Sequence, residues 1–307
     1  MSSRSTGALL GVVFVAGVVL VVLFLFRGQE PVQQPSASLA ASPSPSFNEA
    51  LLSERLTVLV IGLDSSESRR AQGLGANSDT LILASVNADQ SEVTLISLPR
   101  DTVDIPLSDG TTWTSKVNGI YAAEGVDALV DAVSTLFDVP VGGYVQVDMD
   151  DLEALVDAVD GVEVNPAEPL DDTHASLNLH LSAGPQTLDG RTALAYVRTR
   201  VDTDYGRAAR QQEVLLDLVS RLVSPETDVD VSLLLDGLNS FETDLPLEDL
   251  PTLLEIGRRA QLATVTRQVL QPPEFITFEG DAGDGRGYVL EPDVDAIRAY
   301  AARTIGD

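Results

Sequence analysis

The sequence LTVLVIGL at residues 56–63 is followed by two similar runs, TLILASV at 80–86 and VTLISL at 93–98. Each run is short and rich in β-branched residues, a composition that favours a β-strand. The polar segment between the second and third runs, NADQ at 87–90, is typical of a hairpin turn. Pro99 follows the third run, where a proline ends a strand. We therefore expect these strands to form the centre of a β-sheet.

Helices and strands alternate through the rest of the chain. Apolar residues at helical spacing predict helices over 125–137, 150–159, 189–223, 230–260 and 292–304. Further strands are expected at 144–149, 162–164 and 263–270. Loops are expected at 65–78 and 165–187. Asp150 or Asp151 is the expected N-cap of the helix that begins there. The order of elements predicts an α/β (α+β) sandwich, with a central mixed β-sheet flanked by helices.

An unbroken apolar run, GALLGVVFVAGVVLVVLFLF, occupies residues 7–26. A run of about 20 apolar residues matches the hydrocarbon core of a bilayer, whereas the apolar part of a signal peptide is roughly 7–15 residues long. A signal peptide stays the alternative, because residues 39–41 (LAA) resemble a cleavage site. We expect residues 1–6 to be a short cytoplasmic tail, 7–26 one transmembrane anchor, 27–54 a Pro/Ser-rich linker and 55–307 an extracytoplasmic catalytic domain.

Composition excludes several classes of function. The formal net charge of −28 argues against a large basic surface, so we expect no nucleic-acid partner. The chain has no cysteine, which excludes a thiol nucleophile and a cysteine metal site. It has only two histidines, His174 and His180, which excludes a histidine-rich metal centre. Neither a Gly-rich phosphate loop nor a G-x-S-x-G motif is present.

Arginines gather in the window RTALAYVRTRVDTDYGRAAR, residues 191–210, although the chain as a whole is acidic. On the helix predicted next, Arg207 and Gln211 share one face with apolar residues further along. A buried guanidinium needs a partner, and a phosphate near the N-terminus of that helix would supply one. The alternative is an internal network of ion pairs with Asp202 and Asp204.

Three aspartates lie at the ends of predicted strands: Asp64 in GLDSS, Asp79 in NSDT and Asp101 in PRD. Loops at such an edge commonly build functional sites. Two or three carboxylates together with a pyrophosphate suit Mg²⁺, which retains waters and binds few protein oxygens. Each aspartate taken singly is equally consistent with a cap or a turn.

Seven segments in unbroken order, from about Thr57 to Leu222, carry a resemblance to a known family. They are GLDSS, NSDTLILASVN, VTLISLPRDTVDIP, KVNGIYAAEG, VQVDMDDLEALVDAVDGVEV, AGPQTLDGRTALAYVRTR and GRAARQQEVL. In these segments the chain resembles the LytR–CpsA–Psr family of cell-wall glycopolymer ligases. The resemblance implies transfer of a polyprenyl-pyrophosphate-linked glycopolymer to peptidoglycan through a phosphodiester.

The resemblance also implies roles for particular residues. Asp64 and Asp79 match the positions that hold Mg²⁺. The residues that match pyrophosphate-binding positions are Arg100, Arg198, Arg200, Arg207 and Gln211. The family holds its lipid in an apolar tunnel, which helices around 125–137, 150–159 and 214–222 would line here. Asn77 departs from the pattern, because the family often carries an arginine before its Ser-Asp-Thr.

The mechanism expected from these residues is direct displacement at phosphorus. Mg²⁺ and arginines, Arg100 among them, neutralise the pyrophosphate, and an acceptor hydroxyl attacks the phosphorus next to the sugar. Asp79 or Asp101 takes the proton, and lipid monophosphate leaves. The expected partners are the lipid-linked glycopolymer, peptidoglycan and, through the anchor, the cell membrane.

Two alternatives use the same residues. A pyrophosphatase would pass the phosphoryl group to water, and a non-catalytic protein would bind or regulate lipid-linked wall precursors without turnover.

Overall fold

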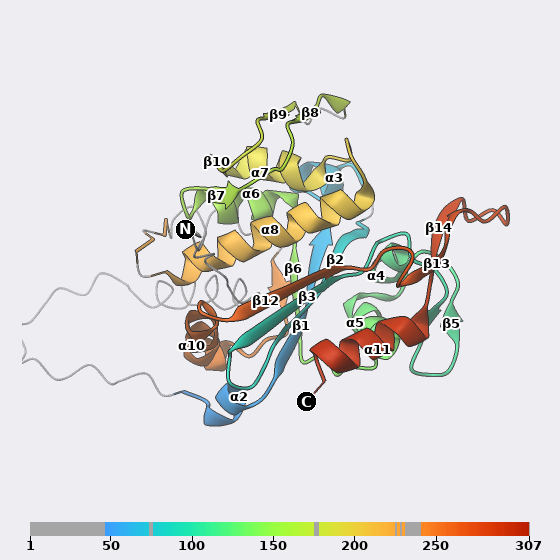
Figure 1. Ribbon diagram of the computed structural model, residues 1–307, viewed down its shortest axis with the longest axis horizontal. Helices are drawn as coiled ribbons and strands as arrows, with labels where there is room; N and C mark the ends of the chain where they lie inside the picture. Colours follow the sequence, from blue (N-terminus) through green and yellow to red (C-terminus); the bar gives the residue numbers. More distant parts are fainter. Residues whose placement is uncertain are drawn as a thin grey trace, which may run out of the picture.

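The computed structural model describes residues 47–73, 76–174, 178–224, 226–227, 229–230 and 241–306. Within these ranges the main sheet has six strands in the order β11-β6-β1-β2-β3-β12 (Figure 1). Their bounds are β1 Leu56–Leu63, β2 Ser78–Val86, β3 Glu92–Ser97, β6 Tyr144–Val147, β11 Glu242–Thr243 and β12 Thr264–Val269. Strands β1, β2 and β3 pair antiparallel, whereas β6 is parallel to β1 and β12 is parallel to β3. The predicted central mixed sheet is confirmed.

The side chains of β1 alternate between two separate apolar cores. Val58 and Val60 belong to one core, and Leu59 and Ile61 belong to the other. All four side chains are buried. Because burying one such side chain stabilises a fold by about 1.5–3 kcal/mol, a strand of this composition favours a helical layer on each face.

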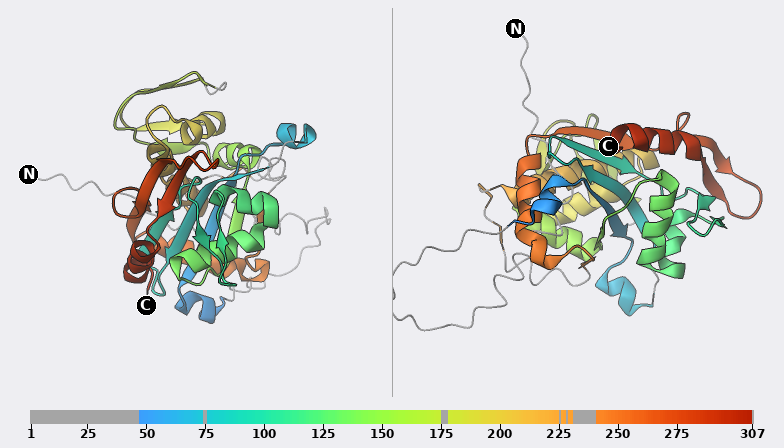
Figure 2. Two further views of the ribbon diagram at one scale, coloured as in Figure 1. Left: turned by 90° about the vertical axis from the view of Figure 1, so that its right-hand side faces the viewer. Right: turned by 90° about the horizontal axis from the view of Figure 1, so that it is seen from below.

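Helices cover both faces of the sheet (Figure 2). The core around Val60 is closed by α6 Met149–Asp157, α7 Gly190–Arg198, α8 Asp204–Val223 and α10 Leu250–Ala260. The core around Ile61 is closed by α4 Ile120–Glu124, α5 Val126–Phe137 and α11 Val294–Thr304. The prediction of a sheet flanked by helices is therefore confirmed.

The helical segment predicted at 189–223 is divided into two helices. Thr199 leaves the helical conformation with a ψ of 143°, which ends α7. The side chain of Thr203 then accepts a hydrogen bond from the backbone of Gly206 and caps α8. Residues 199–203, called the α7–α8 connection below, bring the ends of two arginine-bearing helices together.

Several predicted loops contain regular structure. Helix α3 Glu67–Ala71 lies within the expected loop at 65–78. The expected loop at 165–187 contains β8 Leu170–Asp172 and β9 Leu179–Leu181, and β10 Gln186–Leu188 begins near its end and pairs with β7 Val162–Val164. These loop predictions were wrong because such short elements carry too few apolar positions to show a period.

The cap of α6 also differs from the prediction. The side chain of Asp148 accepts hydrogen bonds from the backbones of Asp150 and Asp151, so Asp148 is the N-cap. The Asp151 side chain accepts a hydrogen bond from the Asp148 backbone and completes a capping box. Asp150 and Asp151, the expected caps, therefore lie in the first turn of α6, where the Asp148 side chain bonds their backbone N–H groups.

The C-terminal third contains a hairpin that sequence patterning did not indicate, formed by β13 Ile276–Asp281 and β14 Tyr288–Pro292. A smaller hairpin lies earlier in the chain and is formed by β4 Ile105–Pro106 and β5 Thr112–Trp113. The last helix, α11, begins at Val294 and is capped by Asp293. Of the helical segment predicted at 230–260, residues 231–240 lie outside the described residues, and only α10 and the 3₁₀ turn η3 Leu247–Asp249 are helical in the described remainder.

In the described part of the chain, no helix is long and apolar enough to span a bilayer. The anchor predicted at 7–26 lies outside that part. The end of the expected linker carries helix α2 Glu49–Ser53, which buries Leu52. The Asn48 backbone donates a hydrogen bond of 2.8 Å to the Thr252 hydroxyl of α10, so this segment is tied to the sandwich.

Candidate active site

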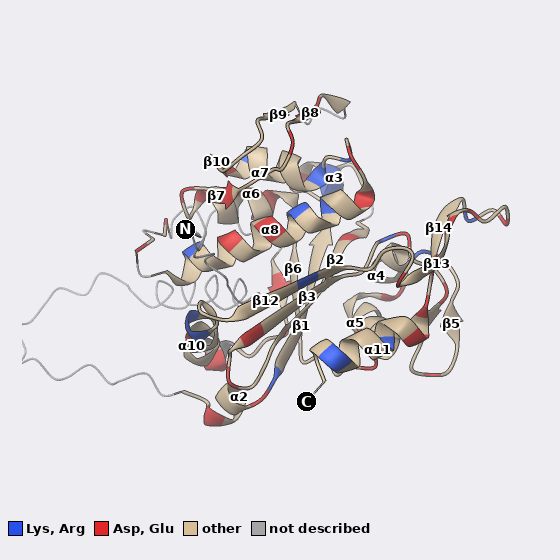
Figure 3. Cartoon of the chain, viewed as in Figure 1, with Lys and Arg blue, Asp and Glu red and all other residues tan. Residues whose placement is uncertain are grey.

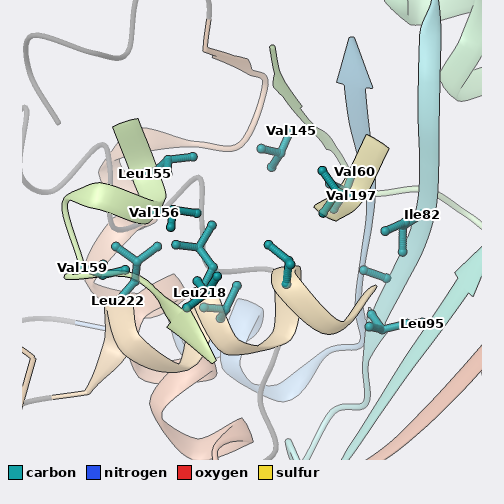
Figure 4. Close-up of a cluster of buried hydrophobic side chains, with 14 of the residues drawn as sticks. Val60, Ile82, Leu95, Val145, Leu155, Val156, Val159, Val197, Leu218 and Leu222 are labelled. Carbon is teal, nitrogen blue, oxygen red and sulfur yellow. The ribbon is translucent and has the colours of Figure 1, made fainter. Parts of the chain in front are cut away.

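A cavity of about 440 Å³ lies between the sheet and helices α6, α7 and α8. Its inner walls are apolar and come from both layers. They include Val60, Ile82, Val145, Leu155, Val197, Val214 and Leu218. Figure 4 shows most of these side chains converging between the strands and the helices. This interior suits an apolar chain rather than a polar ligand.

The mouth of the cavity is polar and charged. The cavity is also lined by Asp148, Asp172 and His174, and the polar residues that concern us at the mouth are Asp64, Asp79, Arg100, Arg198, Arg200, Arg207 and Gln211. They are the residues that the sequence analysis assigned to metal and pyrophosphate binding. In Figure 3, basic residues of α3 and of the first half of α8 lie toward the same end of the molecule. An apolar interior behind a cationic mouth is the shape of a site for an amphiphile with an anionic head.

Strand register brings the two aspartates to one place. Leu63 pairs with Ser78 across β1 and β2, and each aspartate is the next residue in the chain, Asp64 after Leu63 and Asp79 after Ser78. The Asp64 backbone donates a hydrogen bond of 3.0 Å to the carbonyl of Asn77. A Cβ at Gly62 would lie 2.8 Å from the Cβ of Thr80, so glycine permits this close approach of the strands.

The loop after β3 supplies Arg100 and Asp101. Arg100 forms an ion pair with Asp79, and its Nε lies 3.5 Å from Asp101. Asp101 is also paired with Lys116 at 2.6 Å, and Asn118 donates a hydrogen bond of 3.4 Å to Asp79. These contacts orient Asp79 and Arg100 toward the cavity. Lys116 and Asn118, which sequence analysis left without a role, hold this arrangement from the segment KVNG.

Helix α7 and α3 approach Asp64 from the other side. Arg198, the last residue of α7, lies 3.9 Å from one carboxylate oxygen of Asp64, and Arg69 lies 3.2 Å from the other. Arg69 was not expected at the site, because it lies in a segment that the sequence predicted to be a loop. The local sequence does carry a signal for this helix: Ser66 is its N-cap, and Glu67 is an acidic residue in its first turn.

Arg207 is the most deeply buried arginine at the mouth, with 8% of its side chain exposed. It shares Asp204 with Arg200, at 3.4 and 3.2 Å respectively. Its Nε has no hydrogen-bond partner among the described residues. Burial lowers the pKa of Arg207 to about 10, and the nearby Arg200 and Arg100 act in the same direction, against Asp204. A bound anion would accept a hydrogen bond from the Arg207 Nε and would offset the repulsion of Arg207 by Arg200 and Arg100.

The arginine window at 191–210 therefore contains both of the arrangements that the sequence left open. Arg198, Arg200 and Arg207 line the cavity, as an anion site requires. Arg210 belongs to an internal ion pair, because it contacts Asp202 at 2.7 Å and is 7% exposed.

Gln211 lies where the polar mouth meets the apolar interior. Its side chain donates a hydrogen bond of 3.2 Å to the carbonyl of Val197. This bond links α8 to α7 directly behind the arginines, so Gln211 closes the mouth as well as lining it.

The expected lining of the apolar tunnel is partly corrected. Helices α6 and α8 line the cavity as expected, but α5, at 126–137, packs on the opposite face of the sheet. Its place is taken by α7, through Leu194 and Val197. The helical period of α5 revealed an apolar face but not which face of the sheet it covers.

The carboxylates at the mouth fit Mg²⁺ as a partial set of ligands, two in number. Asp64 and Asp79 line the same cavity and are 30% and 23% exposed. Within the described ranges there is no group of three or more side chains of the His, Cys, Asp or Glu type that could hold a metal alone. Two carboxylates suit Mg²⁺ when phosphate oxygens and waters supply the other ligands.

Fold and site together define an α/β protein with an arginine–aspartate anion site above an apolar cavity. The chain belongs to the LytR_cpsA_psr family, whose model matches residues 22–288.

Named relatives agree with this membership. The chain is 32% identical over 228 residues to the polyisoprenyl-teichoic acid–peptidoglycan teichoic acid transferase TagU of Enterococcus faecalis, covering 73% of this chain and 72% of that one. It is 28% identical over 259 residues to biofilm regulatory protein A of Streptococcus mutans, covering 79% and 61% respectively. The crystal structure of B. subtilis TagV matches 82% of this chain and 98% of its own with a TM-score of 0.65; at 22% identity it supports the fold alone.

Proposed function

We propose that this protein transfers a glycopolymer from a polyprenyl pyrophosphate carrier to peptidoglycan and forms a phosphodiester bond. The observation that carries the proposal is that one cavity of about 440 Å³ is lined by apolar side chains from the sheet and helices and also by four arginines, with Asp64 and Asp79 among its aspartates. A lipid pyrophosphate has this division into an apolar chain and an anionic head. The name of the Enterococcus relative, a transferase acting on polyisoprenyl-linked teichoic acid and peptidoglycan, supports the same reaction.

In the proposed mechanism the lipid lies between the sheet and α6–α8, and the pyrophosphate lies among the arginines. Arg100, Arg198, Arg200 and Arg207 bind its oxygens, and their fixed charges stabilise the negative charge that spreads in the transition state. Asp64 and Asp79 would hold Mg²⁺, which supplies further charge neutralisation when bound.

The acceptor hydroxyl oxygen forms a bond to the phosphorus that bears the sugar. The bond from that phosphorus to the bridging oxygen breaks, and lipid monophosphate leaves. Asp79 or Asp101 accepts the hydroxyl proton. Both are oriented for this by their contacts with Arg100.

We also propose that residues 7–26 anchor the chain in the cell membrane and that the sandwich lies outside the cytoplasm. The length and composition of the apolar run support the anchor. A membrane anchor would place the cavity near its lipid substrate, and peptidoglycan lies on that side of the membrane.

The test uses the full chain in detergent with a labelled polyprenyl-pyrophosphate saccharide, peptidoglycan oligomers and either Mg²⁺ or EDTA. We expect Mg²⁺-dependent labelling of the acceptor that is lost in Asp79→Ala and Arg198→Ala. Arg258→Ala is the matched control, because Arg258 is exposed on α10 and contacts Glu255 there. Release of saccharide phosphate into water without labelled acceptor would instead identify a pyrophosphatase, and binding without turnover would identify a binding or regulatory protein.

A further inference from the structure

A second cavity of about 230 Å³ adjoins the mouth of the first. The two cavities share Asp79, Arg100, Arg207 and Gln211. The remaining walls of the second cavity come from the first turn of α8, the loop after β3 and the β13–β14 hairpin. None of the site residues derived from sequence, apart from those shared and Asp101, belongs to it.

The order of residues along α8 places the two cavities on opposite sides of the arginines. Thr203, Asp204 and Tyr205 line only the second cavity. Arg207 and Gln211 line both, Ala208 between them lines only the second, and Val214, Leu215 and Leu218 line only the first. A molecule that lies along α8 therefore passes from the apolar interior, across the shared polar residues, into the second cavity.

The outer wall of the second cavity is tied to the catalytic loop by backbone hydrogen bonds. Leu290 of β14 donates to the carbonyl of Asp101 at 3.1 Å and accepts from the backbone of Val103 at 3.0 Å. The hairpin thereby holds Tyr288 and Glu279 beside Arg100 and Asp101. Movement of one segment is coupled to the other through these bonds.

Glu279 joins the hairpin to α8 across the cavity. One of its carboxylate oxygens accepts a hydrogen bond of 3.0 Å from the hydroxyl of Tyr205, and the other accepts a bond from the hydroxyl of Tyr288. Burial raises the pKa of Tyr288 to about 12, with the bond to Glu279 acting in the same direction. Burial likewise raises the pKa of Tyr205. Both phenols remain protonated hydrogen-bond donors at neutral pH.

The chemistry of this wall suits a sugar rather than an anion. Tyrosine rings offer apolar faces to pack against a pyranose and hydroxyls to bond it. Glu279, Asp101 and Asp204 accept hydrogen bonds from hydroxyl or amide groups and repel negative charge. Arginines are confined to the side that the first cavity shares.

We infer that the second cavity binds the acceptor, an amino sugar of the peptidoglycan glycan strand, and that Tyr205, Tyr288 and Glu279 position its attacking hydroxyl. This inference rests on the proposed transferase function. In-line displacement requires the attacking oxygen to approach phosphorus opposite the leaving oxygen. Since the leaving lipid phosphate points to the apolar cavity, the attack comes from the side of the second cavity, which Asp79 and Asp101 both line.

The experiment measures KM separately for donor and acceptor with the full chain and its Tyr288→Ala, Tyr288→Phe and Glu279→Gln variants. We expect the acceptor KM of Tyr288→Ala to rise at least about fivefold, because the ring contact is lost, while its donor KM changes less than about twofold. Tyr288→Phe keeps the ring and should show a smaller rise. Phe278→Ala is the matched control and should keep both values, because Phe278 lies next to Glu279 on β13 but does not line the cavity.

Direct binding separates failure of this inference from failure of the proposed function. Binding of a labelled peptidoglycan disaccharide to the wild-type chain, weakened in Tyr288→Ala, supports the acceptor cavity even in the absence of transfer. A wild-type chain that neither transfers nor binds the disaccharide overturns the function and the cavity together. Intact transfer with an unchanged acceptor KM in all three variants, or an equal rise of both KM values, overturns the acceptor cavity alone.

Discussion

Two arginines one turn apart on α8 are equally buried but have opposite environments. Arg210 donates to the carbonyls of Tyr196 and Thr199 and pairs with Asp202, so its charge is compensated within the fold. Arg207 has an ion pair with Asp204 and an Nε without a partner among the described residues. A buried charge with incomplete compensation costs stability, so the fold itself gives no reason for the position of Arg207, whereas the proposed anion site does.

We predict that Arg207→Met abolishes transfer without destabilising the protein. Loss of a charge that contacts the pyrophosphate should lower kcat/KM by about 100-fold or more. The melting temperature should stay the same or rise by about 2–4 °C, because a desolvated charge is replaced by an apolar chain. Asp204 is 38% exposed and keeps Arg200, so it is not left as an unpaired buried charge. Calorimetry and the transfer assay check both parts, and a large fall in melting temperature would show that Arg207 is structural.

At the scale of elements, the α7–α8 connection positions three of the site arginines. It joins Arg198, at the end of α7, to Arg207, in the second turn of α8, and carries Arg200 itself. Arg210 holds this connection in place through two hydrogen bonds. Its Nε donates to the carbonyl of Tyr196 at 3.0 Å, and one terminal nitrogen donates to the carbonyl of Thr199 at 2.6 Å. The guanidinium also lies 5.6 Å from the centre of the Tyr196 ring.

We predict that Arg210→Met destabilises the protein and weakens donor binding. Removing the guanidinium leaves two buried carbonyls without these bonds, so the free energy of unfolding should fall by about 2–4 kcal/mol. The donor KM should rise because Arg198 and Arg200 lose their fixed positions. Urea unfolding and donor KM, measured well below the melting temperature, test this. Arg207→Met is the matched comparison, since the two variants should affect stability in different ways.

At the scale of the whole molecule, the apolar cavity exists because one helical layer does not close fully on the sheet. Leu155 of α6, Val197 of α7 and Leu218 of α8 face Val60 and Ile82 across it. The opposite layer, with α5 and α11, packs on the other face and forms a separate core. The cavity therefore lies on the side of the sheet that α6, α7 and α8 cover.

We predict that Leu218→Trp discriminates between donors of different lipid length. The larger ring should fill the inner cavity, and overpacking by about 1–3 kcal/mol corresponds to roughly a tenfold loss for a long chain. A donor with a short lipid chain that stays near the mouth should lose much less. Leu262→Trp is the control, because residue 262 is exposed. Equal losses for long and short donors would mean that the lipid does not occupy this cavity.

Elements were predictable where the local sequence carries their apolar period, and they were missed where it does not. Runs such as 56–63 and helices such as α5 and α8 carry their period locally, so their type was predictable from the sequence. The aspartates and arginines of the mouth were found through charge and position in the chain and through family resemblance. The β13–β14 hairpin was missed because its strands are short and largely exposed on one side, with Phe278 and Tyr288 as exposed large residues.

The sequence by itself determined most of the strands of the main sheet and the long helices, and together with the family resemblance it identified the aspartates and arginines at the mouth. Only the tertiary structure decided that Val60 faces the cavity and Ile61 the other core, because a strand buried on both faces shows no alternation of polarity. It also decided that Arg207 lines the cavity whereas Arg210 pairs with groups of the fold. The helical period places a residue on a face, but its environment depends on the long-range packing of segments that lie far apart in the chain.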